Sequence, residues 1–321
     1  MKTIKNLFLE KINNNFRSVT KTKQVTGLSV CLDFIVQAVP DSIKIVVSDL
    51  KQVELAINRF SPVNLVLGYN FLNHNELKSI RIRYPFIKIY LIIHSPISFL
   101  AADQSGFRSL YEALDLGCKV IVNDPRFDMG INGVIHLENC YNIKLHERIN
   151  PVIKDEFNVI CSGSVRVLKN HMAQAVAAMI YCDENNLKLN FHCNLGRSEL
   201  AASVITNLKL LFTRNRNHKL VSIPWQDHKE FVTSLSKYHL GMQVSFTESY
   251  NLVSADYITA GLPMVVSSEI RFASDKIKAC PNNVRDIANK IKDAHLHVEE
   301  SRVKFVNHNN KAVAMWKKEL S

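Results

Sequence analysis

The sequence predicts an α/β fold made of two consecutive domains, each with a parallel sheet between two layers of helices. Short β-branched runs alternate with helix-like segments along most of the 321 residues, which is typical of parallel strands joined by right-handed helical crossovers. This length exceeds that of one ordinary small core. A proline among polar residues, at Asn150-Pro151, interrupts the alternation. We therefore expect two Rossmann-like domains over residues 1–150 and 151–295, facing a crevice, and a closing helix over residues 296–321.

The first predicted domain begins with a weak strand pattern over residues 5–12, and a polar loop then leads to an apolar helix over residues 28–39. Further β-branched runs predict strands at residues 43–47, 64–67, 88–93, 120–122 and 134–137. Helix-like segments between them include residues 51–60 and 108–116.

The second predicted domain repeats this alternation. Its predicted strands are residues 157–161, 189–193, 220–223, 241–244 and 264–266. A helix is expected at residues 170–182, and a second is marked by Leu200, Val204, Leu208 and Leu211 on one face. Apolar residues at helical spacing from Val303 to Leu320, with lysines between them, favour an amphipathic helix packed on a domain over a membrane helix.

Composition narrows the class of protein further. Hydrophobic residues make up 47% and charged residues 21%, which is typical of a globular protein, and no apolar run approaches the length of a membrane span. The first ten residues are too polar for a signal peptide. The seven scattered cysteines contain no CxxC pair, so we expect reduced thiols in a cytoplasmic protein and neither a zinc site nor a disulfide framework.

A glycine and two cations follow the predicted strand at residues 157–161. Gly163 lies at the expected strand-to-helix turn, and Arg166 and Lys169 come within the next few residues. Backbone amides at such a glycine can approach a phosphate, which the two cations would neutralise. A simple turn followed by a solvated helix start explains the same residues equally well.

Two acids eight residues apart form the second motif. Glu248 precedes a polar turn, Asp256 lies in the apolar helix-like segment that follows, and a Gly261-Leu262-Pro263 turn leads to the strand at residues 264–266. Carboxylates at this spacing suit a ligand with hydroxyl groups at two places, because each can accept bidentate hydrogen bonds. The alternative is a helix start favoured by Glu248 and a second acid that faces water.

Two further side chains stand at predicted strand ends. Trp225 follows the strand at residues 220–223, where an aromatic ring could border a nucleotide base or form part of the core. His94 closes the strand at residues 88–93, where it could meet a ligand, act as an acid or base, or be hydrogen-bonded in a turn.

Taken in order, these motifs resemble the nucleotide-sugar-binding half of GT-B glycosyltransferases, specifically the retaining family-four type, which includes glycogen synthase-like proteins. The resemblance covers residues 157–268 well and the first half in outline. It implies that Arg166 and Lys169 hold the diphosphate of a UDP- or GDP-sugar, that Glu248 binds the donor sugar and that Asp256 binds the ribose diol. It assigns further donor contacts to Gly163 and His94, and to the backbone amides of Tyr250, Asn251 and Leu252. Trp225 is added to the donor-binding candidates because of its position after the strand at residues 220–223. Asp256 stands where the family has glutamate, and Asn251 where it has glycine.

The resemblance also implies a reaction. Fixed cations would stabilise the leaving diphosphate as the anomeric C–O bond breaks, without a metal or other cofactor, and the sugar would be transferred with retention. The sequence contains no DxD pair that suggests a metal site. A nucleotide-sugar epimerase and a nucleotide-sugar-binding protein without transferase activity are the alternatives.

The acceptor is expected to bind the first half. The chain carries a formal charge of +11, and its first 25 residues alone carry +5. A basic loop containing Arg17, Lys21, Lys23 and Gly27 favours a phosphate-bearing acceptor. We weigh duplex DNA with a hydroxylated base, as in phage-type base glucosylation, slightly above a lipid-linked or surface glycan. A solubilising terminus explains the same charge.

Overall fold

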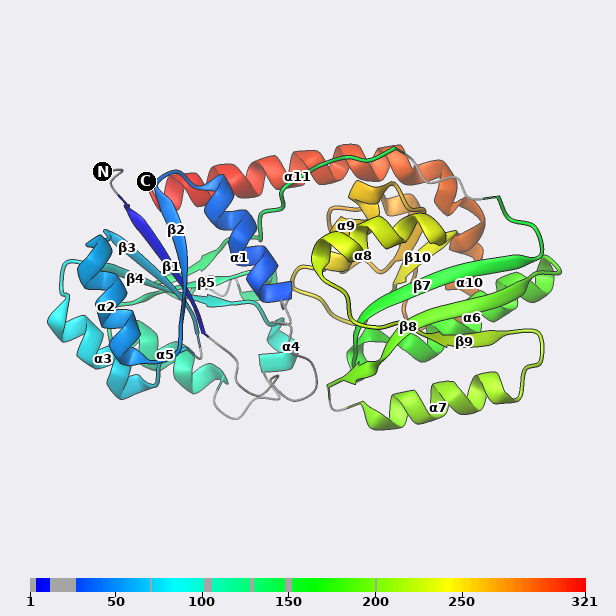
Figure 1. The fold of residues 1–321 in the computed structure, drawn as a ribbon, viewed down its shortest axis with the longest axis horizontal. Helices are drawn as coiled ribbons and strands as arrows, with labels where there is room; N and C mark the ends of the chain where they lie inside the picture. The colour runs from blue at the N-terminus through cyan, green and yellow to red at the C-terminus, as the bar shows by residue number, and fades with distance from the viewer. Residues whose placement is uncertain are drawn as a thin grey trace. The chain divides into compact units, whose positions relative to one another are not determined.

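The computed structural model describes residues 4–11, 27–69, 71–100, 106–127, 130–147, 152–199 and 201–321. The chain divides into two compact units: one is Met1–Asn142 with Asn309–Ser321, and the other is Ile143–His308. Each unit contains one parallel sheet with helices packed on it (Figure 1). The α/β class and the two sheets predicted from the sequence are confirmed.

The sheet of the first unit has the strand order β2-β1-β3-β4-β5-β6, and every pairing is parallel. Both faces are covered, so its central strands are continuous apolar runs rather than alternating ones. The strands are β1 (Asn6–Lys11), β2 (Ser42–Val47), β3 (Asn64–Gly68), β4 (Lys88–Ile93), β5 (Lys119–Val122) and β6 (Val134–His136).

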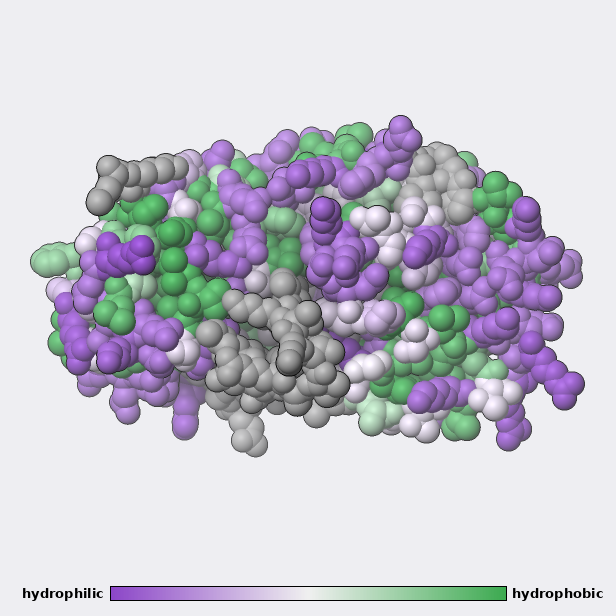
Figure 2. Space-filling view, viewed as in Figure 1, coloured by the Kyte–Doolittle hydropathy of each residue, from purple (hydrophilic) through white to green (hydrophobic). Residues whose placement is uncertain are grey.

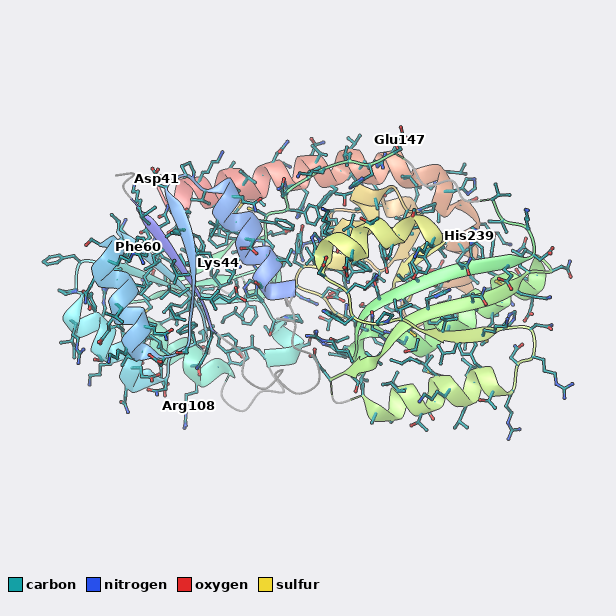
Figure 3. All side chains as sticks on the ribbon, viewed as in Figure 1. Asp41, Lys44, Phe60, Arg108, Glu147 and His239 are labelled. Atoms are coloured by element: carbon teal, nitrogen blue, oxygen red, sulfur yellow. The ribbon has the colours of Figure 1, made fainter. Side chains whose placement is uncertain are left out.

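The helices of the first unit begin at polar caps or are tied to strands by charges. Asp49 caps α2 by accepting a hydrogen bond from the amide of Gln52, and Asn73 with Glu76 forms a capping box at α3. Lys44 on β2 lies 2.6 Å from Asp33 of α1 and 3.0 Å from Glu10 of β1 (Figure 3). The helices are α1 (Gly27–Ala38), α2 (Leu50–Phe60), α3 (His74–Arg83), α4 (Ile97–Leu100) and α5 (Gly106–Asp115), with a short 3-10 turn, η2 (Pro125–Phe127).

The sheet of the second unit has the order β11-β10-β7-β8-β9. Its strands are β7 (Glu156–Val165), β8 (Lys188–Ser198), β9 (Lys219–Ser222), β10 (Leu240–Gln243) and β11 (Met264–Val266). β7 and β8 run beyond their predicted ends, and the register of their pairing shifts on both sides of Ser164. Gly163 lies in this irregular stretch with φ of +106°, a conformation that side chains disfavour, so the glycine permits the shift.

The helices of the second unit are α6 (His171–Glu184), α7 (Ala202–Thr213), α8 (His228–Ser234), α9 (Leu252–Ala260) and α10 (Val284–Asp293). Short 3-10 turns lie at η3 (Val167–Lys169), η4 (Leu235–Lys237), η5 (Asp275–Ile277) and η6 (Ala294–His297). The α9 helix approaches β10 closely, because a Cβ atom at Gly241 would stand 2.4 Å from the ring of Tyr257. Tyr257 is fully buried there, and its hydroxyl lies 2.8 Å from Ser162 Oγ.

The last helix, α11 (Val298–Glu319), is divided between the two units. In the second unit Phe305 packs against Phe272, with ring centroids 5.1 Å apart. In the first unit Trp316 is fully buried beside Phe8, and its Nε1 donates a 2.7 Å hydrogen bond to the carbonyl of Glu138. Across the described parts of the chain, no helix is both long and apolar enough to cross a membrane.

Replacing Trp316 with alanine should therefore destabilise the first unit by about 3–5 kcal/mol, since it removes a fully buried aromatic side chain and leaves a cavity. Urea denaturation measures the loss as a lower midpoint. Met315→Ala, at a neighbouring position that is 43% exposed, is the control and should shift the midpoint far less. Equal shifts in the two variants would contradict this packing role.

Candidate functional site

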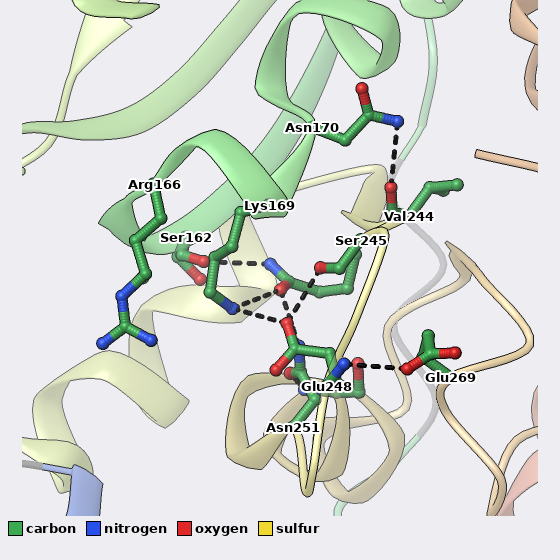
Figure 4. Close-up of polar contacts among 12 residues, drawn as sticks. Ser162, Arg166, Lys169, Asn170, Val244, Ser245, Glu248, Asn251 and Glu269 are labelled. Atoms are coloured by element: carbon green, nitrogen blue, oxygen red, sulfur yellow. Dashed lines mark hydrogen bonds and ion pairs between the residues drawn. The ribbon is translucent and has the colours of Figure 1, made fainter. Parts of the chain in front are cut away.

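The candidate site lies in the second unit, where the carboxyl ends of two neighbouring strands meet. β7 ends at Val165 and leads through η3 to Lys169, and β10 ends at Gln243 and leads to the loop that carries Glu248. These two strands pair in parallel, so their carboxyl ends lie on the same edge of the sheet. Figure 4 shows Lys169 and Glu248 pointing toward each other from these two segments.

An ion pair between Lys169 and Glu248 is the centre of this site. Lys169 Nζ lies 3.0 Å from Glu248 Oε1, and the two side chains are only 14% and 13% exposed. The same carboxylate oxygen accepts hydrogen bonds from Ser245 Oγ at 2.8 Å and from Asn251 Nδ2 at 3.1 Å. The structure thus brings together the cation and the first acid that the sequence assigned to a donor site.

Gln243 connects this ion pair to the sheet, and the sequence analysis did not single it out. Its Oε1 accepts from Lys169 Nζ at 3.4 Å and from Asn251 Nδ2 at 2.9 Å. Its Nε2 donates to the carbonyl of Ser162 at 2.9 Å. One buried amide therefore holds β7, Lys169 and the start of α9 in a fixed relation.

The electrostatics keep Glu248 ionised. Burial raises the pKa of this carboxyl, but the charge of Lys169 and the hydrogen bonds from Lys169 and Ser245 lower it by more, so the pKa lies below its ordinary value. A negative charge is therefore present at neutral pH in a nearly closed pocket of donors. Such a carboxylate can accept hydrogen bonds from hydroxyl groups of a ligand.

Two arginines lie near the carboxyl ends of β7 and β8. Arg166 follows β7, is 43% exposed and pairs with Glu199 at 2.7 Å. Arg197 belongs to β8, and its guanidinium carbon lies 3.8 Å from the centre of the Trp225 ring. Arg166 and Trp225 were predicted from the sequence, whereas Arg197 was not, because the strand was expected to end at Cys193, four residues before Arg197. Arg166 and Arg197 thus place two cations at this edge of the sheet, beside the aromatic face of Trp225 and the carboxylate of Glu199.

The amide of Gly163 has a protein partner in this structure. It donates a 3.0 Å hydrogen bond to Asn194 Oδ1, and Asn194 in turn donates to the carbonyl groups of Ile223 and Pro224. A Cβ atom at Gly163 would meet the end of the Lys169 side chain at 3.8 Å, so the positive φ, rather than space, requires glycine.

Asp256 is buried against α8. Its side chain is 3% exposed, and Oδ1 lies 2.7 Å from Nε2 of His228, which is 28% exposed. Burial lowers the pKa of His228, but the hydrogen bond and the charge of Asp256, with a smaller contribution from Asp227, raise it above its ordinary value. Of this pair, the histidine presents more surface to solvent. His228 was not found from the sequence, because nothing local connects it to an acid 28 residues away.

The loop after Glu248 is organised around the start of α9. Asn251 caps this helix by accepting from the amide of Ser254 at 2.8 Å, and Leu252 is the first helical residue. Tyr250 packs on Phe272 with ring centroids 5.2 Å apart. The amide of Glu248 donates to Glu269 Oε2 at 2.9 Å. The Asn251 side-chain amide that caps α9 is thus fixed by protein contacts.

The remaining candidate residues belong to the first unit and are described by themselves. His94 follows β4; burial lowers its pKa to about 4, although its hydrogen bond with the Asn123 side chain acts to raise it, so the ring is neutral at neutral pH. Gly27 is the first residue of α1. The predicted acceptor residues Arg17, Lys21 and Lys23 lie outside the described residues.

Metal-ligating side chains and cysteines were the remaining candidates for chemistry in this chain. Among the residues with a described position, no group of three or more His, Cys, Asp or Glu side chains is placed to hold a metal ion. All seven cysteines are free thiols, six of them buried, and only Cys280 is exposed.

Comparisons with known proteins were made at the level of sequence and of structure. No protein-family model matches the chain, and no curated protein matches its sequence. A trehalose-6-phosphate structure from E. coli, bound with UDP-2-fluoro glucose, is similar over 98% of this chain and 97% of its own, with a TM-score of 0.64 and 9% identity. A sucrose-phosphate synthase from Thermosynechococcus elongatus is similar over 98% and 96%, with a TM-score of 0.62 and 12% identity. TarM is similar over 92% of this chain and 58% of its own, with a TM-score of 0.58 and 15% identity.

These likenesses establish the class of fold. Two Rossmann-like α/β units in one chain, similar over almost its whole length to these structures, define the GT-B fold. The GT-B fold predicted from the sequence is confirmed. At identities of 15% or less, the likeness defines the fold and leaves the chemistry to the residues of this chain.

The burial of the Lys169–Glu248 pair predicts how the stability of a Lys169 variant depends on pH. Replacing Lys169 with methionine should cost about 3–5 kcal/mol near neutral pH, because Glu248 is left buried without its cation. Without the cation the folded-state pKa of Glu248 rises. The deficit relative to the unchanged protein should therefore shrink as pH falls through that raised pKa.

Urea midpoints at about pH 7.5 and about pH 5 measure this deficit. Lys276→Met, at an exposed position of the same unit, is the matched control and should show a small deficit at both pH values. The double variant Lys169→Met with Glu248→Gln should lose most of the pH dependence. A deficit that does not change with pH in the single variant would contradict the coupling.

Proposed function

We propose that the chain is a glycosyltransferase that moves a sugar from a UDP- or GDP-sugar to an acceptor hydroxyl, with retention and without a metal ion. The observation that carries this proposal is the buried Lys169–Glu248 pair at the carboxyl edge of a parallel sheet, with Arg166 beside it in the sequence. The GT-B fold supports it, since one structural neighbour is bound with a UDP-sugar analogue.

In this proposal the cations receive the diphosphate. An ammonium group has three donors, and Glu248 and Gln243 accept two of the contacts of Lys169, so a phosphate oxygen can take the third. Arg166 is partly exposed and can turn a donor of its guanidinium from Glu199 to phosphate. As the anomeric C–O bond breaks, negative charge grows on the diphosphate, and these fixed positive charges stabilise it.

Glu248 is the proposed binding residue for the donor sugar. Its carboxylate is held by Lys169, Ser245 and Asn251 in one orientation, so hydroxyl groups of the donor sugar can hydrogen-bond to it without reorganisation of the loop. Trp225, stacked by Arg197, is the proposed border of the nucleotide base. His94, neutral through burial, is kept as the proposed contribution of the first unit to the sugar site.

The ribose is assigned to the Asp256–His228 pair rather than to Asp256 alone. Asp256 is almost fully buried and already bonded to the imidazole, so the partly exposed group that can meet a ribose hydroxyl is His228. Asp256 orients this ring. Asp256 is one methylene shorter than the glutamate expected at this position. In this proposal the His228 ring, which is bonded to Asp256, contacts the ribose in its place.

For the acceptor, we propose duplex DNA with a hydroxylated base, and a lipid-linked or surface glycan is the second candidate. The support is the charge of +11 and the basic segment of the first 25 residues, whose excess suits a phosphate-bearing molecule. The proposal assigns acceptor contacts to Arg17, Lys21, Lys23 and Gly27.

Turnover tests the donor site. The protein is incubated with a panel of UDP- and GDP-sugars, with and without hydroxylated DNA, and the products are identified by mass spectrometry. Glu248→Ala and Lys169→Ala should each lower donor-dependent turnover by about 100-fold or more, because each removes a fixed charge at the reacting group. Glu230→Ala, at an exposed acid of α8, is the matched control and should keep turnover.

Each result has a distinct meaning. Full activity in either site variant would overturn the assignment of the donor site. Binding of a nucleotide sugar without turnover would indicate a binding protein, and an altered sugar without transfer would indicate an epimerase. A sugar attached to a glycan but not to DNA would replace the proposed acceptor.

The pH dependence of donor affinity tests the ribose assignment. His228 is protonated below its raised pKa, and its charged ring donates a stronger hydrogen bond than the neutral ring. Donor affinity should therefore fall by about tenfold as pH rises from about 7 to about 9. Calorimetric titration of the nucleoside diphosphate measures this change. In His228→Gln the decrease should vanish, and an unchanged decrease in that variant would remove His228 from the site.

A further inference from the structure

A stretch of the second unit carries positive charge without any acid in its sequence. Residues 200–226 contain no Asp or Glu, and their basic residues lie on α7, on the loop after it and at the start of β9. We call these the α7–β9 cations: Lys209, Arg214, Arg216 and Lys219. Within so short a segment they lie near one another, since the loop from Arg214 to His218 is the whole connection between the helix and the strand.

All of the α7–β9 cations are exposed. No ion pair joins any of them to another residue within the described part of the chain, whereas many other basic residues, such as Lys44, Lys169 and Arg302, are paired. β9 is the edge strand of its sheet, and α7 lies beside it (Figure 1). In the space-filling view, hydrophilic residues gather at the end of this unit where Figure 1 places the connection from α7 to β9 (Figure 2). The field of these cations is therefore directed to solvent.

The loop that carries them is anchored. His218 is 3% exposed; its Nδ1 accepts from the amide of Leu189 at 3.1 Å, and its Nε2 lies 3.0 Å from Asp183 Oδ1. Two acids at the end of α6 have partners of their own, because Asp183 is bonded to His218, and Glu184 is paired with Arg285 and Lys292. The cations are thus presented from a fixed loop, with little neutralisation from α6.

The surface around these cations suits phosphate more than lipid. Asn215 and Asn217 lie between them, and their side-chain amides carry hydrogen-bond donors. The outward face of α7 is made of small and polar residues, and its one large exposed apolar side chain is Leu210, at 58%. A helix that inserts at a membrane surface needs several large apolar side chains on that face.

We propose that the α7–β9 cations form a docking surface for the phosphodiester backbone of a nucleic acid duplex. The surface is separate from the residues of the donor site, and its biological meaning rests on the proposed nucleic-acid acceptor, which it would hold along its backbone. Backbone contacts of this kind carry no sequence information and make binding strongly dependent on salt.

Binding of a fluorescent duplex of about 20 base pairs with unmodified bases, followed by anisotropy from about 50 to about 300 mM salt, tests the proposal. Each phosphate contact contributes about 0.9 to the slope of log K against log salt. Replacing all of the α7–β9 cations with glutamine should lower that slope by up to about 3.6 and weaken binding at low salt by more than about tenfold. The single variant Arg216→Gln should lower the slope by about 1.

The control variant removes the same formal charge from exposed positions elsewhere. It replaces these residues with glutamine: Lys51, Lys78, Lys88 and Lys276. The control should keep most of the slope, and equal slopes in the two multiple variants would overturn the proposal, as would binding of the unchanged protein to vesicles of anionic lipid but not to the duplex.

Donor turnover, measured on the same samples, separates this proposal from the proposed function. If the duplex binds with the expected slope and no sugar is transferred, the docking surface stands and the transferase proposal fails. If sugar is transferred to another acceptor and the duplex does not bind, the docking surface fails alone.

Discussion

The ion pair between Lys169 and Glu248 is the interaction on which the arrangement of the second unit's loops depends. A carboxylate buried to this degree without a cation would be forced to take up a proton. With Lys169, Ser245, Asn251 and Gln243 around it, the charge is retained, and segments that follow two different strands are held at fixed positions. An enzyme that acts on charged donors gains a preorganised site by this means, since no loop has to order itself when the ligand arrives.

Most of the fold could be predicted from the sequence, because the pattern of apolar residues along the chain determines which segments are buried. Strands β3, β4, β5, β10 and β11 are short runs of apolar and often β-branched residues, and their predicted bounds lie within a residue or two of those observed. α3 was not singled out, since only Leu77 and Ile80 of its ten residues are buried and its pattern is mostly polar. The ends of β7 and β8 were placed too early, because the pairing of the two strands continues past Cys161 and Cys193, at which the predicted strands end.

Only those site residues that lie at the end of a strand or the start of a helix could be predicted from the sequence. Lys169, Glu248 and Asn251 were found because each follows a recognisable strand or opens a helix, and the parallel topology brings such positions to one edge. Gln243 and His228 carry no local signature: one is the last residue of a buried strand, and the other opens a short helix. What they do depends on contacts with residues far away in the sequence, at Ser162 and Asp256, and only the folded structure supplies those.

The division of α11 between the two units has a consequence for synthesis of the chain. The core around Phe8 and Tyr90 includes Trp316 and Leu320, so the first unit to leave the ribosome lacks part of its own interior until residues 309–321 have been synthesised. The second unit, Ile143–His308, is a continuous segment and can close earlier. The nascent first unit therefore keeps an apolar surface uncovered while the whole second unit is synthesised.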